Sequence, residues 1–301
     1  MLTSNQIVKA IVLLPKTNLI LPEFLALLTD IKPVITHNLN QNEARLIKDN
    51  FPELYIACRI LFMGEKRLPL CALSKNKSFA EKTIDLFCTK KIDMELIGKL
   101  LGYPQCCVRS YLKFINNNQQ YNSSFVTYKA YKNSQKYSYY CNNLLNFSSR
   151  VDDSKISNYQ HYELNNNPPF PLRYFQYISH IPCQYDCPKS IRIGKETSAL
   201  LQKYIPKVEK TIKNTLSRPI LFFDIFKLII FDGDLRKGVL HYQKVLPPFF
   251  LIDSTLMDFI NNGNQIVINK NKITIMKNNS TLYVYRKKSE TDGFILNFRS
   301  S

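Results

Sequence analysis

The sequence predicts an α+β protein with a mixed N-terminal α/β layer, central helices that carry cysteines, and a C-terminal antiparallel β-sheet. Three observations predict this class. Residues 1–92 mix helical patterns with apolar strand-like runs, residues 93–218 contain helical patterns that begin at prolines, and residues 219–301 alternate short apolar runs with turn residues. We therefore divide the 301 residues into these three segments, a length that suits one large domain or two ordinary ones.

The N-terminal segment contains one clear helical pattern, at 41–48, and two apolar runs typical of buried strands, at 54–63 and 68–73. Next, Asp93 can cap a short helix, MELIGKL, which Gly102 ends. Pro104 can then occupy the first position of a second helix, which places two adjacent cysteines in its first turn.

Residues 116–169 are rich in Asn, Ser, Tyr and Gln and predict long loops with short helical pieces. Within them, the tyrosines of 128–140 (YKAYKNSQKYSYY) belong to a solvated loop or, alternatively, stack on bases. A third helix should begin at Pro188 and break at Pro206. Beyond Pro219 we expect an antiparallel sheet with a turn at 232–234.

The chain is strongly basic, with 41 Lys and Arg against 23 Asp and Glu and a net charge of +18. This balance favours RNA or another anionic molecule as a partner, and a coding bias towards Lys is the alternative explanation. No uninterrupted apolar stretch of about 18 residues and no secretory signal occur, so we predict a cytoplasmic protein without a membrane span. Glycine-rich phosphate loops are also absent.

Eight cysteines without a secretion signal favour buried thiols, metal ligands or catalysis over a disulfide framework. Cys58, Cys71 and Cys88 lie in apolar surroundings and should be small core residues. Two pairs stand out because each lies next to a proline turn. They are Cys106 with Cys107, and Cys183 with Cys187.

The two pairs allow three interpretations. First, all four thiolates bind one centre, and we prefer an iron–sulfur cluster to zinc because adjacent side chains on a helix diverge by about 100°. Second, one thiol such as Cys107 is a nucleophile or redox group, with His180 or His241 as base. Third, the cysteines only pack in the core, without any cofactor.

Four basic residues accompany the pairs and are candidates for anion binding: Arg109, Lys113, Lys189 and Arg192. They would also stabilise thiolates. The sequence thus predicts a cysteine-ligated metalloprotein, and an enzyme acting on an anionic substrate is one hypothesis. The alternatives are a thiol-based enzyme and a basic module that is stabilised by a structural zinc ion and binds nucleic acid.

The two cysteine blocks resemble the prokaryotic domain of unknown function 483 and its relatives. The first block matches at Leu101, Gly102, Tyr103, Pro104, Cys106, Cys107 and Val108, and the second at His180, Pro182, Cys183, Cys187 and Ser190. The resemblance covers about 90–115 and 165–200. It implies that the two blocks form one site, and it implies no reaction.

Overall fold

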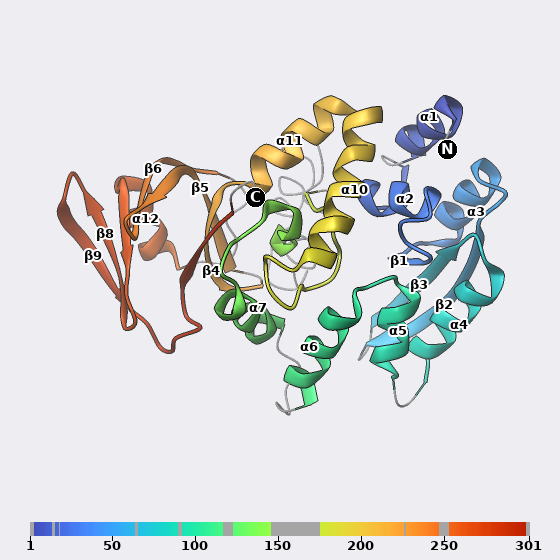
Figure 1. Ribbon diagram of the computed structural model, residues 1–301, viewed down its shortest axis with the longest axis horizontal. Helices are drawn as coiled ribbons and strands as arrows, with labels where there is room; N and C mark the ends of the chain where they lie inside the picture. The colour runs from blue at the N-terminus through green and yellow to red at the C-terminus, as the bar shows by residue number, and fades with distance from the viewer. Residues whose placement is uncertain are drawn as a thin grey trace.

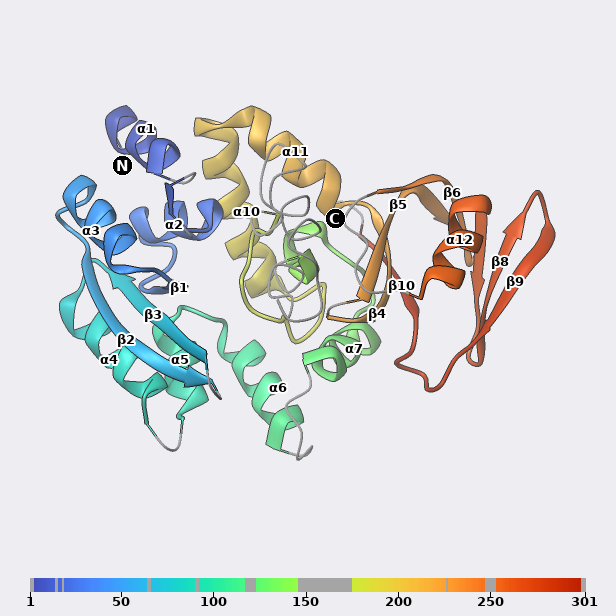
Figure 2. The ribbon, with the colours of Figure 1, turned by 180° about the vertical axis from the view of Figure 1, so that it is seen from behind.

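The computed structural model confirms the α+β class and describes residues 3–13, 16–17, 19–63, 66–89, 92–116, 123–145, 175–225, 227–246 and 253–298. A small antiparallel sheet and a larger one lie at opposite ends of the molecule, with helices of the middle part between them (Figure 1). The view from behind shows the same arrangement (Figure 2). The two ends are therefore joined through the segment that carries the cysteine pairs.

The small sheet has the strand order β1-β3-β2, with bounds Ile35–Asn38, Lys66–Ser74 and Tyr55–Met63. The helices of this end are α1 (Ser4–Leu13), α2 (Leu21–Leu28), α3 (Gln41–Asn50) and α4 (Lys77–Phe87). The Asn40 side chain caps α3 by accepting from the Glu43 N–H, and Glu43 accepts from the Asn40 N–H in return. The helix and both strands predicted here are confirmed.

Cys58 and Cys71 form a disulfide, which corrects the prediction that both are reduced core residues. They are paired directly across β2 and β3, with Cα atoms 4.1 Å apart. Opposed residues approach this closely in antiparallel strands, and inspection of either strand alone does not reveal the pairing. Cys71 is buried in the core as predicted, whereas Cys58 is exposed on β2 and Cys88 is exposed at the end of α4, so these two are not core residues.

The middle segment consists mainly of helices: α5 (Met94–Leu100), α6 (Gln105–Asn116), α7 (Ser123–Asn133), α10 (Pro188–Tyr204), α11 (Pro206–Leu216) and the short 3-10 helix η2 (Tyr139–Cys141). Asp93 caps α5 as predicted, since its side chain accepts from the Leu96 N–H at 2.9 Å. Gly102 follows α5 with φ of +74°, a conformation that favours glycine. Pro206 separates α10 from α11, also as predicted.

The tyrosines of 128–140 lie in the core, so the prediction of a solvated loop was wrong. Tyr128 and Tyr139 are buried, and the ring of Tyr131 stacks on Tyr137 at 5.7 Å and contacts Phe294 at 4.5 Å. The rings of Tyr128 and Tyr131 pack against Phe294 of the large sheet, and Tyr139 packs against Tyr177, so these rings are engaged in the core and not in base stacking. Of the stretch predicted as loop, 117–122 and 146–169 lie outside the described residues.

The large sheet is antiparallel with the strand order β10-β4-β5-β6-β7-β8-β9. The bounds are β4 (Pro219–Asp224), β5 (Lys227–Arg236), β6 (Val239–Leu246), β7 (Gln265–Ile268), β8 (Lys272–Lys277), β9 (Ser280–Arg286) and β10 (Phe294–Asn297), with α12 (Ser254–Asn262) between β6 and β7. The turn expected at 232–234 is instead an irregularity within β5. The chain reverses at Lys237 and Gly238, whose φ angles of 50° and 80° suit a two-residue hairpin.

One buried apolar cluster joins all three predicted segments, since it includes Leu25, Ile212 and Phe298. Because this cluster does not separate the three segments, the segment boundaries near 92 and 218 remain a prediction. Among the described residues, no helix is both long enough and apolar enough to cross a membrane.

Candidate metal centre

Two helix starts and one loop position the four cysteines. Cys106 and Cys107 lie in the first turn of α6, where the Pro104 carbonyl accepts from the N–H groups of both Cys107 and Val108 at 2.9 and 3.0 Å. Cys187 is the residue directly before α10, whose first position is Pro188. Cys183 lies in the loop that leads to this helix. α10 begins at Pro188 as predicted, whereas α6 begins at Gln105, one residue after the predicted Pro104.

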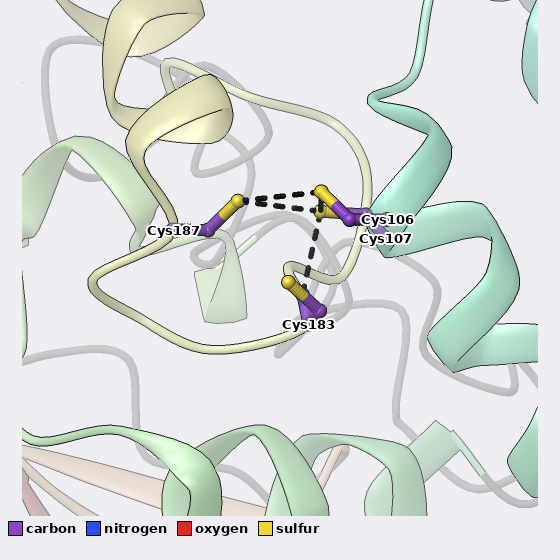
Figure 3. Close-up of side chains that lie close together, drawn as sticks. All are labelled: Cys106, Cys107, Cys183 and Cys187. Carbon is purple, nitrogen blue, oxygen red and sulfur yellow. Dashed lines mark hydrogen bonds between the residues drawn. The ribbon is translucent and has the colours of Figure 1, made fainter.

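The four sulfurs converge, as Figure 3 shows. The Cys106 sulfur lies 3.9 Å from that of Cys107 and 3.7 Å from that of Cys187, and the Cys107 and Cys187 sulfurs are 3.8 Å apart. Together with Cys183, all four lie within 4.8 Å of one another. The structure thus brings together the two pairs that the sequence analysis linked, and the group could hold a metal ion.

Hydrogen bonds surround the buried side of this group. The Cys183 N–H donates to the Cys107 sulfur at 3.4 Å, and the Ser190 hydroxyl lies 3.3 Å from the same sulfur. The Ser190 oxygen is also 2.9 Å from His180 Nε2. His180, a candidate catalytic residue, therefore contacts the cysteine group through a serine. The Tyr103 ring packs against the imidazole ring of His180, with the two ring centroids 5.0 Å apart.

Two sulfurs are buried and two are partly exposed. Cys107 and Cys187 are each 2% exposed, whereas Cys106 and Cys183 reach the surface. Hydrogen bonds from Cys107 and Cys183 hold the pKa of Cys187 far below its usual range. Hydrogen bonds with Cys183 and Cys187, together with burial, raise the pKa of Cys107 far above it.

The pKa of Cys183 shifts in the same direction as the pKa of Cys107. Its hydrogen bond with Cys107 lowers its pKa, but the bond with Cys187 and burial outweigh this and raise it to about 12. Among these cysteines, the hydrogen bonds therefore favour a thiolate at Cys187 and thiols at Cys107 and Cys183. Binding of a metal ion would release the remaining protons.

The candidate bases and anion-binding residues have different surroundings. Burial, reinforced by the charge of Lys32, lowers the pKa of His180 to about 3, so its ring is neutral near pH 7. His241 is exposed on β6, where it pairs with Gln265, and it is not part of the cysteine group. The four basic candidates are exposed on α6 and α10, and their role in anion binding stays a prediction: Arg109, Lys113, Lys189 and Arg192.

Sequence reasoning missed a second buried polar cluster, formed with residues of the N-terminal part. Lys32 Nζ lies 2.7 Å from Glu23 Oε1, and His37 Nε2 lies 3.4 Å from Glu23 Oε2. Burial alone would raise the pKa of Glu23, but the charges of Lys32 and His37 lower it to about 2. The only sequence signal was an acidic residue within the apolar run LPEFLALL.

No curated protein and no solved structure matches this chain. A family match does exist, and it includes Cys106 and Cys107 but ends before Cys183. Residues 81–162 match the family described as "Protein of unknown function (DUF483)", which confirms over this part of the chain the resemblance drawn from the cysteine motifs.

Proposed function

We propose that this protein is a metalloprotein that binds one metal ion, preferably Zn²⁺, through the thiolates of Cys106, Cys107, Cys183 and Cys187. The spacing of the sulfurs is the observation that carries the proposal. A tetrahedral ion with metal–sulfur bonds of about 2.3 Å requires sulfurs about 3.8 Å apart. The three separations among the sulfurs of Cys106, Cys107 and Cys187, 3.7, 3.8 and 3.9 Å, lie at this value, and the Cys183 sulfur lies within 4.8 Å of each of them.

The same spacing favours a single ion over the iron–sulfur cluster expected from the sequence. That expectation rested on the divergence of adjacent side chains, yet the Cys106 and Cys107 sulfurs are only 3.9 Å apart. In a four-iron cluster each thiolate binds a different iron atom, so the four sulfurs lie further apart than the ligands of one ion. Iron remains the alternative that metal analysis must test.

Four protein ligands complete a tetrahedron, which is typical of structural zinc sites and leaves no position open for a substrate. Cys107 lies in α6 and Cys187 lies directly before α10, so the ion would join α6 to the start of α10. These two ligands are 80 residues apart in the sequence. Its role in this proposal is to hold two distant turns together. A reactive thiol, the second interpretation, would require one of these cysteines to remain free of metal.

The binding partner and the cellular location of the protein are also part of this proposal. The net charge of +18 supports an anionic partner such as RNA, whose affinity should then fall steeply with salt. A group of reduced cysteines fits a cytoplasmic location, whereas the disulfide between Cys58 and Cys71 is typical of oxidising compartments.

The test is anaerobic purification followed by metal analysis, and then replacement of the bound ion by Co²⁺. We expect one zinc per chain and a Co²⁺ spectrum with intense sulfur-to-metal charge transfer that Cys107→Ser reduces. Cys88→Ser, which alters an exposed thiol, is the matched control and should leave the spectrum unchanged. Several iron atoms per chain and a brown colour would show that the centre is an iron–sulfur cluster and not a zinc ion. The absence of both metals would refute the proposal and favour a thiol site.

A further inference from the structure

The cysteine motifs contain two further buried polar residues, His180 and Ser190, which are not metal ligands in the proposed centre. Ser190 is fully buried in the first turn of α10, and His180, in the turn before Cys183, is 6% exposed. A buried hydroxyl and a buried imidazole each cost free energy unless they form hydrogen bonds. Their position beside the sulfurs therefore calls for specific partners.

These two residues find their partners within the site. The Ser190 oxygen lies 3.3 Å from the Cys107 sulfur and 2.9 Å from His180 Nε2. The Asn143 side chain donates to the His180 carbonyl at 2.9 Å, and the Tyr103 ring lies against the imidazole. The backbone and the ring of His180 are thus both held in place, and Ser190 connects the ring to a metal ligand.

Metal binding would fix the direction of both hydrogen bonds of Ser190. A metal-bound thiolate has no proton and only accepts, so the Ser190 hydroxyl must donate to Cys107. A hydroxyl has one proton, so Ser190 accepts from its other neighbour, His180 Nε2. Burial and the charge of Lys32 lower the pKa of His180 to about 3, so the ring is neutral near pH 7 and its single N–H lies on Nε2.

The Cys107 thiolate needs such donors more than an exposed thiolate would. Four thiolates carry more negative charge than one Zn²⁺ ion neutralises, and Cys107 is only 2% exposed, so water stabilises it little. Two protein donors approach its sulfur instead, the Ser190 hydroxyl at 3.3 Å and the Cys183 N–H at 3.4 Å. Hydrogen bonds to a charged acceptor are among the stronger ones in proteins, and partners of a metal ligand commonly control metal affinity.

We propose that Ser190 and His180 are positioning residues of the metal centre: Ser190 donates to the Cys107 thiolate, and His180 orients Ser190 by donating from Nε2. The inference rests on the proposed function, because the direction of these bonds requires a metal-bound thiolate. It gives His180 a role different from the base expected from the sequence, since a nitrogen that donates to Ser190 cannot accept a proton.

Zinc affinity and the Co²⁺ spectrum of the full-length protein test this inference. Ser190→Ala removes the donor to Cys107. Ser198→Ala is the matched control, because Ser198 is also a buried serine of α10 but its hydroxyl donates to Glu209 at 2.8 Å. At position 180, glutamine keeps an N–H near the place of Nε2 and leucine has none, so His180→Gln and His180→Leu differ mainly in this donor.

We expect Ser190→Ala to weaken zinc binding about tenfold in competition with a chromophoric chelator, and Ser198→Ala to change it less than about twofold. The sulfur-to-metal charge transfer of the Co²⁺ protein should move to longer wavelength in Ser190→Ala, because a thiolate that loses a hydrogen bond gives up electrons more readily. The spectrum of Ser198→Ala should not move. His180→Leu should show part of both changes, and His180→Gln should restore the wild-type values.

Unchanged zinc affinity with an unshifted spectrum in Ser190→Ala overturns the inference. Equal effects of His180→Gln and His180→Leu overturn the role of His180, as does a ring protonated at Nδ1 in ¹⁵N NMR of the zinc-loaded protein. In these cases the wild type still binds metal, so the proposed centre stands. A wild type that binds neither zinc nor Co²⁺ overturns both proposals, so the two failures are distinguishable.

Discussion

Replacing Cys107 by serine should destabilise the protein strongly, but only when metal is present. In the proposed centre, the ion would link Cys107 to Cys183 across 76 residues of chain. For a covalent cross-link of this length, the loss of unfolded-chain entropy stabilises the folded state by about 4.5 kcal/mol. An ion that stays bound in the folded state should contribute at least a comparable amount, because its own binding free energy adds to the term.

Guanidinium unfolding followed by circular dichroism measures this, since the chain has no tryptophan to report by fluorescence. With zinc, Cys107→Ser should lower the free energy of unfolding by about 4 kcal/mol. After treatment with a chelator, the wild type should fall to nearly the level of the variant, within about 1 kcal/mol, because the substitution itself is small. Cys88→Ser should match the wild type under both conditions.

The reasoning is refuted if Cys107→Ser is as stable as the wild type in zinc. It is also refuted if the chelator shifts both proteins equally. In either case the four sulfurs would pack together without forming a metal link between α6 and α10, and the core-packing interpretation of the cysteines would replace the proposed centre.

Three further perturbations test the surrounding structure. The pKa of Glu23 falls from 4.5 to about 2 on folding, so its stabilisation of about 3 kcal/mol is complete above pH 4.5 and is lost as the pH falls towards 2; denaturation at pH 6 and pH 3 should show this dependence, and Glu23→Gln should lack it. Gly102→Ala should cost about 2–3 kcal/mol in thermal or chemical unfolding, because its φ is +74° and a Cβ there would lie 2.7 Å from Pro33 Cδ. Gly238→Ala, with φ of +80° and open space, should cost only about 1 kcal/mol, and equal effects would contradict the role of the contact. Reduction of the Cys58–Cys71 disulfide, which closes a separation of 13 residues, should lower stability by about 3 kcal/mol, and no change on reduction would show that the link is absent in solution.

Local signals in the sequence predicted the parts of the fold that local chemistry controls. Asp93, Gly102 and Pro188 marked helix ends because capping and backbone geometry act over a few residues. The two cysteine blocks could be linked because each had a proline and a helix start beside its sulfurs. The expected divergence of adjacent side chains on an ideal helix did not keep the sulfurs of Cys106 and Cys107 apart, since these residues lie in the first turn of α6 and their sulfurs are 3.9 Å apart. The choice between iron and zinc stays a prediction.

Features that depend on pairing between distant residues were not predictable in this way. The opposition of Cys58 and Cys71 follows from strand register. The turn at Lys237 and Gly238 was missed because an Asp-Gly-Asp sequence four residues earlier carries the more familiar turn signal. In both cases the hydrophobic pattern identified the strands but left their pairing undetermined.

The buried pair of Glu23 and Lys32 connects the N-terminal part to the turns that carry the cysteines. Lys32 reaches Ser179 at 2.7 Å, and Ser179 immediately precedes His180, whose imidazole contacts Ser190 at 2.9 Å. A displacement of either cysteine-bearing turn would therefore leave buried polar groups without partners on both sides, at the Glu23–Lys32 pair and at the cysteine group. The proposed metal ion and the buried ion pair should thus favour the same arrangement of the two turns, so loss of either should weaken the other.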